Sequence, residues 1–355
     1  MRRMLLFVIF SVILLGGLWL GGEALLARTI RQVAQAEPSV QVQDVTPLRH
    51  LGRLGLRATQ LTIDSQGRRT TLPQVMLWAP LTGLNTLHLG LPAVIEADLL
   101  GQPYKIGLDQ AGARATLAPL NGMAIRRLSA NSGKVTLNDQ PLAEAADLQL
   151  TLSRLGHAVP RDAATSYDLK LDLRNADPRA FIPARLPEGR LSIAGQGRVW
   201  LDRILTPAAL QSGDPPRPVG LRADEIRMSL GNLGLRLIGR VLADESGRAQ
   251  GQLMIYTADA PAILALVVEQ GLLPPGVADT IGRMLQQISD ATPDTPADSS
   301  PTAGRIAAPE LEPMHFPKPA DNELRLPLSF RDGRMFLGPM PLGAAPRFPS
   351  PQGGA

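Results

Sequence analysis

The chain has 355 residues, of which 44% are hydrophobic, 19% charged and 4% aromatic, and it contains no cysteine. The absence of cysteine excludes disulfide bonds and thiolate metal sites. Of its 36 basic and 32 acidic residues, four arginines and one glutamate lie in residues 1–36, which leaves 32 basic and 31 acidic residues in the rest. A nearly neutral chain with few aromatic residues lacks the clustered charge and stacking surfaces that bind nucleic acids, so no nucleic-acid partner is expected.

The N-terminus carries a basic pair followed by a long apolar run. Arg2 and Arg3 precede the run from Met4 to Gly22, in which Ser11 is the only hydroxyl residue. As a helix this run would be roughly 28 Å long, close to the hydrocarbon thickness of a bilayer. We therefore expect residues 1–22 to form a transmembrane anchor, with the basic pair on the cytoplasmic side and the rest of the chain exported. The expected location is the inner membrane, single-pass, with the bulk of the chain periplasmic.

A cleaved signal peptide is the alternative interpretation of this segment. It would need small residues at a cleavage site soon after the apolar core. Gly22-Glu23-Ala24 lies close to the core but contains a charge, whereas Ala34-Gln35-Ala36 has suitable residues but lies well downstream. The length of the apolar run favours the uncleaved anchor, and both interpretations export the chain.

The helical pattern continues from residue 23 to residue 36. Leu26, Ile30 and Val33 recur at helical spacing, and Pro38 ends the pattern. This juxtamembrane helix either lies along the membrane surface or packs against the start of the folded domain.

Residues 37–257 are expected to form a β-rich periplasmic domain. The clearest strand is Tyr167–Arg174, in which apolar and charged residues alternate as they do in a strand with one buried face. Shorter runs of the same kind are Leu61–Ile63, Leu148–Leu152, Ile226–Leu230, Leu235–Leu237 and Leu253–Ile255. Turn residues such as Asn138-Asp139 separate them.

Two covering helices are expected within residues 258–289. Asp259 and Pro261 are typical of a helix start, and apolar residues from Val277 to Ile288 recur at helical spacing in the second helix. Residues 290–320 are rich in Pro, Asp, Ser and Thr and are predicted to form a disordered linker. Residues 321–343 are predicted to form a hairpin around Asp332-Gly333 that returns to the sheet, and residues 344–355 a disordered tail.

The sequence contains no motif typical of catalysis or of metal binding. His50, His88, His157 and His315 are scattered, and Gly195-Gln196-Gly197 lacks the third glycine of a dinucleotide loop, so a β-bulge is the better interpretation. We therefore expect no enzyme activity, no cofactor and no metal.

An exported hydrolase remains a less favoured alternative. Its acid and base would have to come from carboxylates such as Asp168, Asp172 and Asp177, of which the first two alternate with basic residues on a polar strand face.

Two segments carry a resemblance to a known family. Leu72–Leu81 and Leu326–Gly343 resemble the corresponding segments of the domain-of-unknown-function family 2125, and the basic start, anchor and short helix match its layout. The resemblance implies a bacterial envelope protein with a periplasmic domain similar to AsmA-type proteins, which form a long, curved sheet with an apolar groove. The expected fold is thus mainly β: a transmembrane helix, then a curved antiparallel sheet that is either an open groove or a closed sandwich.

These observations lead to two principal functional hypotheses. The first is a membrane-anchored protein that handles lipids or maintains the envelope through an apolar groove, and the second is a scaffold that binds another envelope protein. The residues expected to line the groove are Tyr167, Leu169, Leu171, Leu173, Ile226, Met228 and Leu230.

Overall fold

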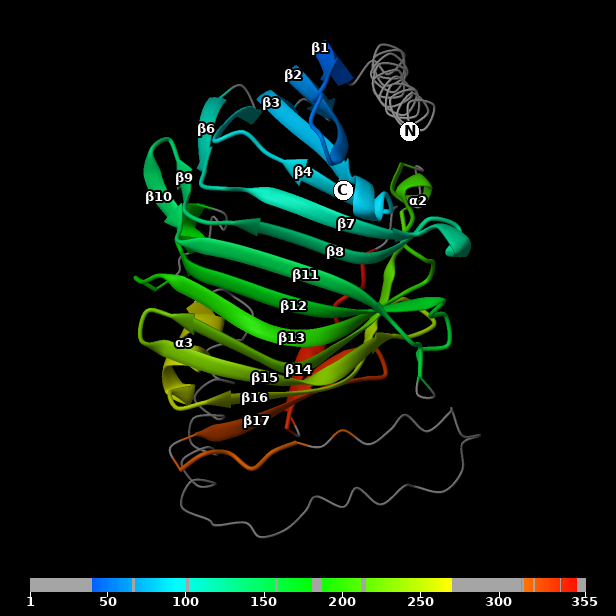
Figure 1. Cartoon of the computed structure of the whole chain (residues 1–355). Coiled ribbons are helices and arrows are strands. Elements are labelled where there is room, and N and C mark those ends of the chain that lie inside the picture. Colours follow the sequence, from blue (N-terminus) through cyan, green and yellow to red (C-terminus); the bar gives the residue numbers. More distant parts are fainter. Residues whose placement is uncertain are drawn as a thin grey trace, which may run out of the picture. The chain divides into compact units, whose positions relative to one another are not determined.

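The computed structural model describes residues 40–65, 68–99, 102–156, 159–180, 187–211, 215–269, 314, 316–321, 323–338 and 340–349. These described residues form nineteen strands and two short α-helices, α2 (Pro207–Gln211) and α3 (Ala260–Glu269) (Figure 1). The prediction of a mainly β protein with a large antiparallel sheet is therefore confirmed.

No helix among the described residues has the length and apolar character needed to cross a membrane. The predicted anchor, juxtamembrane helix, linker up to residue 313 and second covering helix lie outside the described residues. The structure thus tests the β-rich part of the prediction.

The chain folds into two compact units that divide within β11 (Ala145–Ser153), between Gln149 and Leu150. The sequence does not indicate this division, because alternating strands run through it. The strands of unit 1 that precede β11 are β1 (Val40–Pro47), β2 (Arg53–Ser65), β3 (Arg68–Pro80), β4 (Thr86–Gly90), β5 (Val94–Leu99), β6 (Gln102–Leu108), β7 (Gly112–Ala118), β8 (Ala124–Ser132), β9 (Val135–Leu137) and β10 (Gln140–Ala143).

Unit 1 is a sheet that branches at β3. Residues 76–78 of β3 pair with β4, which continues to β7 and β8, whereas residues 69–71 pair with β5, which continues to β6, β9 and β10. Asn138 and Asp139, at the tip of the β9–β10 hairpin, both have positive φ, which is the geometry of a two-residue type I′ turn.

Unit 2 is an antiparallel meander in which each strand pairs with the next. Its strands are β12 (Thr165–Ala176), β13 (Leu191–Leu201), β14 (Pro218–Leu230), β15 (Leu233–Ala243), β16 (Ala249–Thr257), β17 (Leu324–Arg331), β18 (Arg334–Leu337) and β19 (Met340–Ala344). Figure 1 shows β12 to β17 lying side by side in chain order. The C-terminal hairpin thus extends the sheet, with β17 pairing with β16.

Helix α3 begins where the sequence places a helix cap. The Asp259 carboxylate accepts a hydrogen bond from the backbone N–H of Ala262, with a distance of 3.2 Å, and so satisfies one of the free donors of the first turn. Thr257, which is 2% exposed, accepts the backbone N–H of Asp259 and donates to the carbonyl of Gly234. These bonds join the helix start to β15 and β16.

The segment after β19 packs against the sheet. Ala345, which is 2% exposed, forms a buried cluster with Val241, Ala249 and Phe330, and Phe348 packs against this cluster. The backbone N–H of Phe348 also donates to the carbonyl of Gly247. Residues 345–348 are therefore held by the sheet, within the segment for which composition predicts a disordered tail.

A polar clamp holds the segment before β17. The Arg236 guanidinium donates to both carboxylate oxygens of Glu323, at 3.3 and 2.6 Å, and lies 4.3 Å from the centre of the Tyr256 ring. The Tyr256 hydroxyl donates to the carbonyl of Pro317. Burial raises the pKa of Glu323, but hydrogen bonds from Arg236 and from the Ala320 backbone outweigh it, so this pKa lies below its ordinary value.

We predict that Glu323→Gln lowers the free energy of unfolding at pH 7 by about 1–2 kcal/mol, because it leaves a partly buried guanidinium without its counter-charge. A carboxylate with a depressed pKa stabilises the fold above its unfolded-state pKa, and this contribution is lost as the pH falls through the folded-state pKa. The difference in unfolding free energy between wild type and variant should therefore be fully present above pH 4.5, the ordinary pKa of a glutamate, and should shrink as the pH falls below it. Urea unfolding at several pH values measures it.

Glu245→Gln is the matched control. Glu245 pairs with Arg161 at 3.4 Å, but both side chains are more than 80% exposed. Such a pair contributes little to stability, so this variant should unfold like wild type. An equal loss of stability in both variants would contradict the role assigned to the clamp.

Candidate functional site

One face of unit 2 is lined by apolar residues from β12 to β17. Cross-strand partners in an antiparallel sheet share a face, so the pairing register identifies rows of neighbouring side chains. Three such rows run across the six strands: Leu169, Gly197, Ala223, Gly239, Leu253 and Leu328; Leu171, Gly195, Ile226, Leu237, Ile255 and Leu326; and Leu173, Ile193, Met228, Leu235, Thr257 and Leu324. We call the surface formed by these three rows the apolar face.

A β-bulge in β14 places its two halves on the same face. Ala223 pairs with Gly197 and Ile226 pairs with Gly195, so Asp224 and Glu225 together lie opposite the single residue Gln196. The extra residue changes the alternation by one. Without it, Ile226, Met228 and Leu230 would lie on the opposite, charged face.

Two glycines of β13 accommodate this bulge. A Cβ at Gly195 would contact the carbonyl oxygen of Glu225, and a Cβ at Gly197 would contact that of Arg222, both more closely than real Cβ atoms approach a neighbour. The Gly195-Gln196-Gly197 segment therefore lies opposite a bulge, whose extra residue is in β14 and not in the glycine segment itself.

The apolar face is only partly covered. Leu169, Leu171, Leu173, Ile226 and Met228, and Leu230 in the next row, are all of intermediate exposure, although residues of these types are usually fully buried in a core. Leu221, in the adjoining row that also contains Tyr167 and Val199, is 47% exposed. Within the described residues, these strands thus present apolar side chains that are only partly enclosed.

The residues at both ends of the adjoining row are buried. Tyr167 is fully buried, and burial raises the pKa of its hydroxyl, against the effect of a hydrogen bond with the Leu205 backbone. At the other end, Val241 and Phe330 lie beneath Ala345. Tyr167 is therefore a core residue beside the apolar face, and it differs in this from the other six residues that the sequence proposes for the groove.

The opposite face of the sheet carries ion pairs in β12 to β14, beside buried residues such as Trp200, Ile238 and Tyr256. Asp168 lies 2.8 Å from Arg198 on the next strand, and Arg222 lies 2.7 Å from Asp224. Ion pairs of this kind keep a solvated sheet face polar, so the two faces differ sharply in chemistry.

The carboxylates considered for acid and base chemistry each have an arginine partner. Asp168 pairs with Arg198, Asp172 with Arg174 at 3.8 Å, and Asp177 with Arg179 at 3.2 Å. The hydrogen bond from the Arg179 side chain is the main reason that the pKa of Asp177 lies below its ordinary value. Among the described residues, no hydrogen bond joins two of these three carboxylates.

The histidines and acidic residues that the structure describes do not form a metal-ligand set. In the described part of the chain, no group of three or more His, Asp or Glu side chains lies close enough to hold a metal ion. His88 instead stacks on Trp78, with 5.1 Å between the ring centres, and burial and Arg114 lower its pKa.

Sequence reasoning missed half of the apolar face. The alternating pattern predicts strands that contain Leu235, Leu237, Leu253 and Ile255. The local sequence does not show which strands pair with them. Their alternation was visible, whereas the register that joins them to Leu171 and Leu173 depends on the bulge and on the turns between strands.

Comparison with known proteins identifies the family. Residues 52–346 match the model of a family described as an uncharacterized protein conserved in bacteria (DUF2125). The chain belongs to this family. No curated protein and no solved structure matches it, so DUF2125 membership is what the comparisons establish.

We predict that Gly197→Ala lowers the free energy of unfolding by about 1–3 kcal/mol, because the added methyl group would overpack against the Arg222 carbonyl in the bulge. Gly234→Ala in β15 is the control, since a Cβ there meets no atom within 4 Å. Chemical denaturation followed by circular dichroism measures both variants. Equal stability of the two would show that the bulge does not need its glycines.

Proposed function

We propose that this DUF2125 protein is anchored in the bacterial inner membrane and holds the acyl chains of a lipid on the apolar face of unit 2. The anchor is the apolar run 4–22, preceded by Arg2 and Arg3, which would place the strands on the periplasmic side. The role is the handling of lipid for envelope maintenance, with binding rather than catalysis as its chemistry.

The partial exposure of the apolar face is the observation that carries this proposal. Six large apolar side chains from β12 and β14 are left partly exposed, and Leu221 beside them is 47% exposed. An extended exposed apolar surface on a soluble domain is typical of a binding site. Acyl chains are a fitting occupant because they need apolar contact without hydrogen-bonding partners.

The dimensions of the face suit an acyl chain. Six strands with a spacing of about 4.8 Å span roughly 24 Å across the sheet. One acyl chain fills about half of the ~30 Å hydrocarbon core of a bilayer, or roughly 15 Å. A chain that lies across the strands would therefore remain on the face along its whole length.

The energetics favour transfer over tight binding. Removing a methylene group from water is worth about 0.8 kcal/mol, but a lipid that leaves a bilayer gives up an equally apolar environment. The net free energy of exchange is then near zero. A face of this kind can accept a lipid from a membrane and release it again.

We predict that the full chain, extracted from membranes in mild detergent, retains phospholipid, and that Met228→Asp reduces the retained lipid several-fold. The added carboxylate would have to be buried against acyl chains, which costs more than a methionine contact gains. Mass spectrometry of an organic extract measures the lipid bound per protein.

Ser229→Asp is the matched control. Ser229 adjoins Met228 in β14 but lies on the charged face, so the same new charge there should leave the retained lipid unchanged. Circular dichroism checks that both variants are folded. Absence of lipid in the wild type, or equal retention in both variants, would contradict the proposal and favour a scaffold whose apolar face is covered by another protein.

A further inference from the structure

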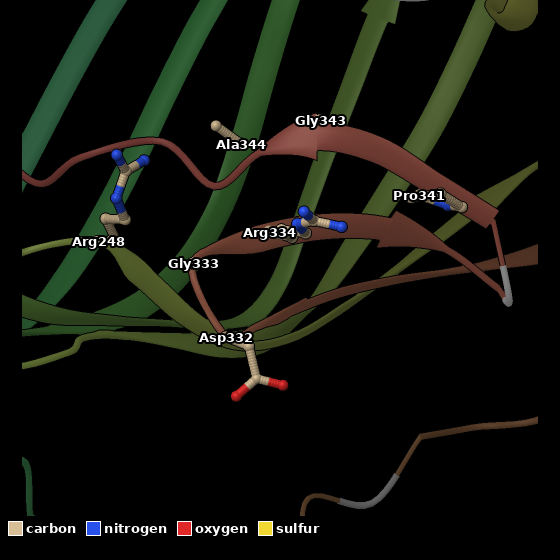
Figure 2. A pocket seen from close by; sticks show the side chains of 7 residues that line it. All are labelled: Arg248, Asp332, Gly333, Arg334, Pro341, Gly343 and Ala344. Atoms are coloured by element: carbon tan, nitrogen blue, oxygen red, sulfur yellow. The ribbon is translucent and has the colours of Figure 1, made fainter.

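Unit 2 contains a hollow of about 470 Å³ between the start of β16 and the β17–β19 hairpin. Its lining residues, shown in Figure 2, are Arg248, Asp332, Gly333, Arg334, Pro341, Gly343 and Ala344. Alternate residues of an extended chain point to opposite sides: Ala344 lines the hollow, and Ala345 faces the buried cluster with Val241 and Phe330. The hollow is thus separate from the apolar face.

Arg248 is held in place by three contacts. Its backbone N–H donates to the Asp244 carboxylate at 2.8 Å, and its guanidinium donates to the carbonyl of Ala345 at 3.1 Å. Its stem packs beneath the hairpin turn, where a Cβ at Gly333 would lie 3.3 Å from Cδ of Arg248. A guanidinium fixed in this way offers further N–H donors without losing more side-chain freedom.

Arg334 supplies a second positive charge from the facing strand. Figure 2 shows its side chain between those of Arg248 and Pro341. Arg331 is the cross-strand partner of Arg334 on β17. Its guanidinium lies 4.5 Å from the centre of the Phe336 ring and adds to the local positive charge. Two guanidinium groups on separate elements can approach one anion from two sides.

The nearby carboxylates do not occupy this space. Asp332 belongs to the wall, but its side chain points away from both guanidinium groups (Figure 2). Asp244 is engaged within its own turn, where one oxygen accepts bonds from the hydroxyl and backbone of Ser246 and from the backbone of Arg248. The hollow therefore carries net positive charge.

The other residues that line the hollow have small side chains and allow a ligand to approach closely. Gly333 and Gly343 have φ of 69° and 141°, which glycine adopts without strain, and a Cβ at Gly343 would meet no atom within 4 Å. Small residues leave room for a group larger than a single ion. A volume of about 470 Å³ lies within the range of small-molecule sites.

We propose that this hollow binds a phosphate monoester, with Arg248 and Arg334 donating to its oxygens. Guanidinium groups match phosphate oxygens in pairs, and phosphate accepts more such bonds than a carboxylate does. The hollow admits the phosphate together with part of the group that carries it, which is either a soluble organic phosphate or the headgroup of a lipid.

The test uses the full chain in a neutral detergent at low ionic strength, with phenyl phosphate as the probe in isothermal titration calorimetry. Saturable binding is expected. Ala344→Glu, which adds a carboxylate to the hollow from an exposed position, should weaken it at least about tenfold, and Arg334→Gln should weaken it by a similar factor through the lost charged hydrogen bonds.

Two matched variants separate the site from general charge effects. Ala344→Gln has the size of the glutamate without its charge, and Arg174→Gln removes an arginine that is 63% exposed on β12. Both should bind phenyl phosphate like wild type. Because Ala344 and Arg334 are exposed, their variants should unfold at the wild-type temperature.

A second arm identifies the source of the phosphate. Fluorescent phosphatidic acid and fluorescent phosphatidylcholine, each in neutral micelles, are compared by anisotropy. Binding of phosphatidic acid that Ala344→Glu abolishes assigns the hollow to a lipid headgroup, and binding of phenyl phosphate alone assigns it to a soluble ligand. Absence of binding in both arms, or equal binding by Ala344→Glu and Ala344→Gln, would overturn the proposal, whatever the result for lipid retention on the apolar face.

Discussion

The cross-strand register of β12 to β17 is the constraint on which the rest of unit 2 depends. Side chains alternate between faces along every strand, so an error of one residue in any pairing would mix the two faces. The bulge at Asp224 and Glu225 is the point where this register is set, because it returns Ile226 and Met228 to the side of Leu171. The glycines opposite the bulge permit it, so β12 to β14 are apolar on one face and carry ion pairs on the other.

A sheet with one incompletely covered face needs stability from elsewhere. In unit 2 this stability comes from contacts around the apolar face: the buried cluster of Phe330 and Ala345, the buried Tyr167, and the ion pair of Arg236 and Glu323. These contacts lie beside the apolar face or on its opposite side. The fold can therefore hold its shape while side chains such as Leu171 remain available to a ligand.

The same arrangement separates two kinds of chemistry. The apolar face offers contact without directed hydrogen bonds, which suits flexible hydrocarbon. The hollow at Arg248 and Arg334 offers two charged donors, of which Arg248 is held in place, and this suits an oxyanion.

Sequence patterns predicted the elements better than their assembly. Alternation identified Tyr167–Arg174 as a strand, and Asp332-Gly333 identified a hairpin whose two turn residues have positive φ, because both signals are local. Alternation likewise placed Leu171 and Met228 in strands, and the register puts both on one face of the sheet. The hollow was not found, because Arg248 and Arg334 are distant in sequence and line the same space only in the folded sheet. The burial of Tyr167 was also not visible in the sequence, because its contact with the Leu205 backbone joins residues that are distant along the chain.

The central claim is that acyl chains contact the apolar face and not the charged one. Because the chain has no cysteine, a bimane label can be placed through Leu171→Cys or Lys170→Cys, at neighbouring positions that face opposite sides of β12. With lipids that carry a nitroxide on the acyl chain, fluorescence should be quenched strongly at residue 171 and weakly at residue 170. Equal quenching at both positions, or none at residue 171, would contradict the account.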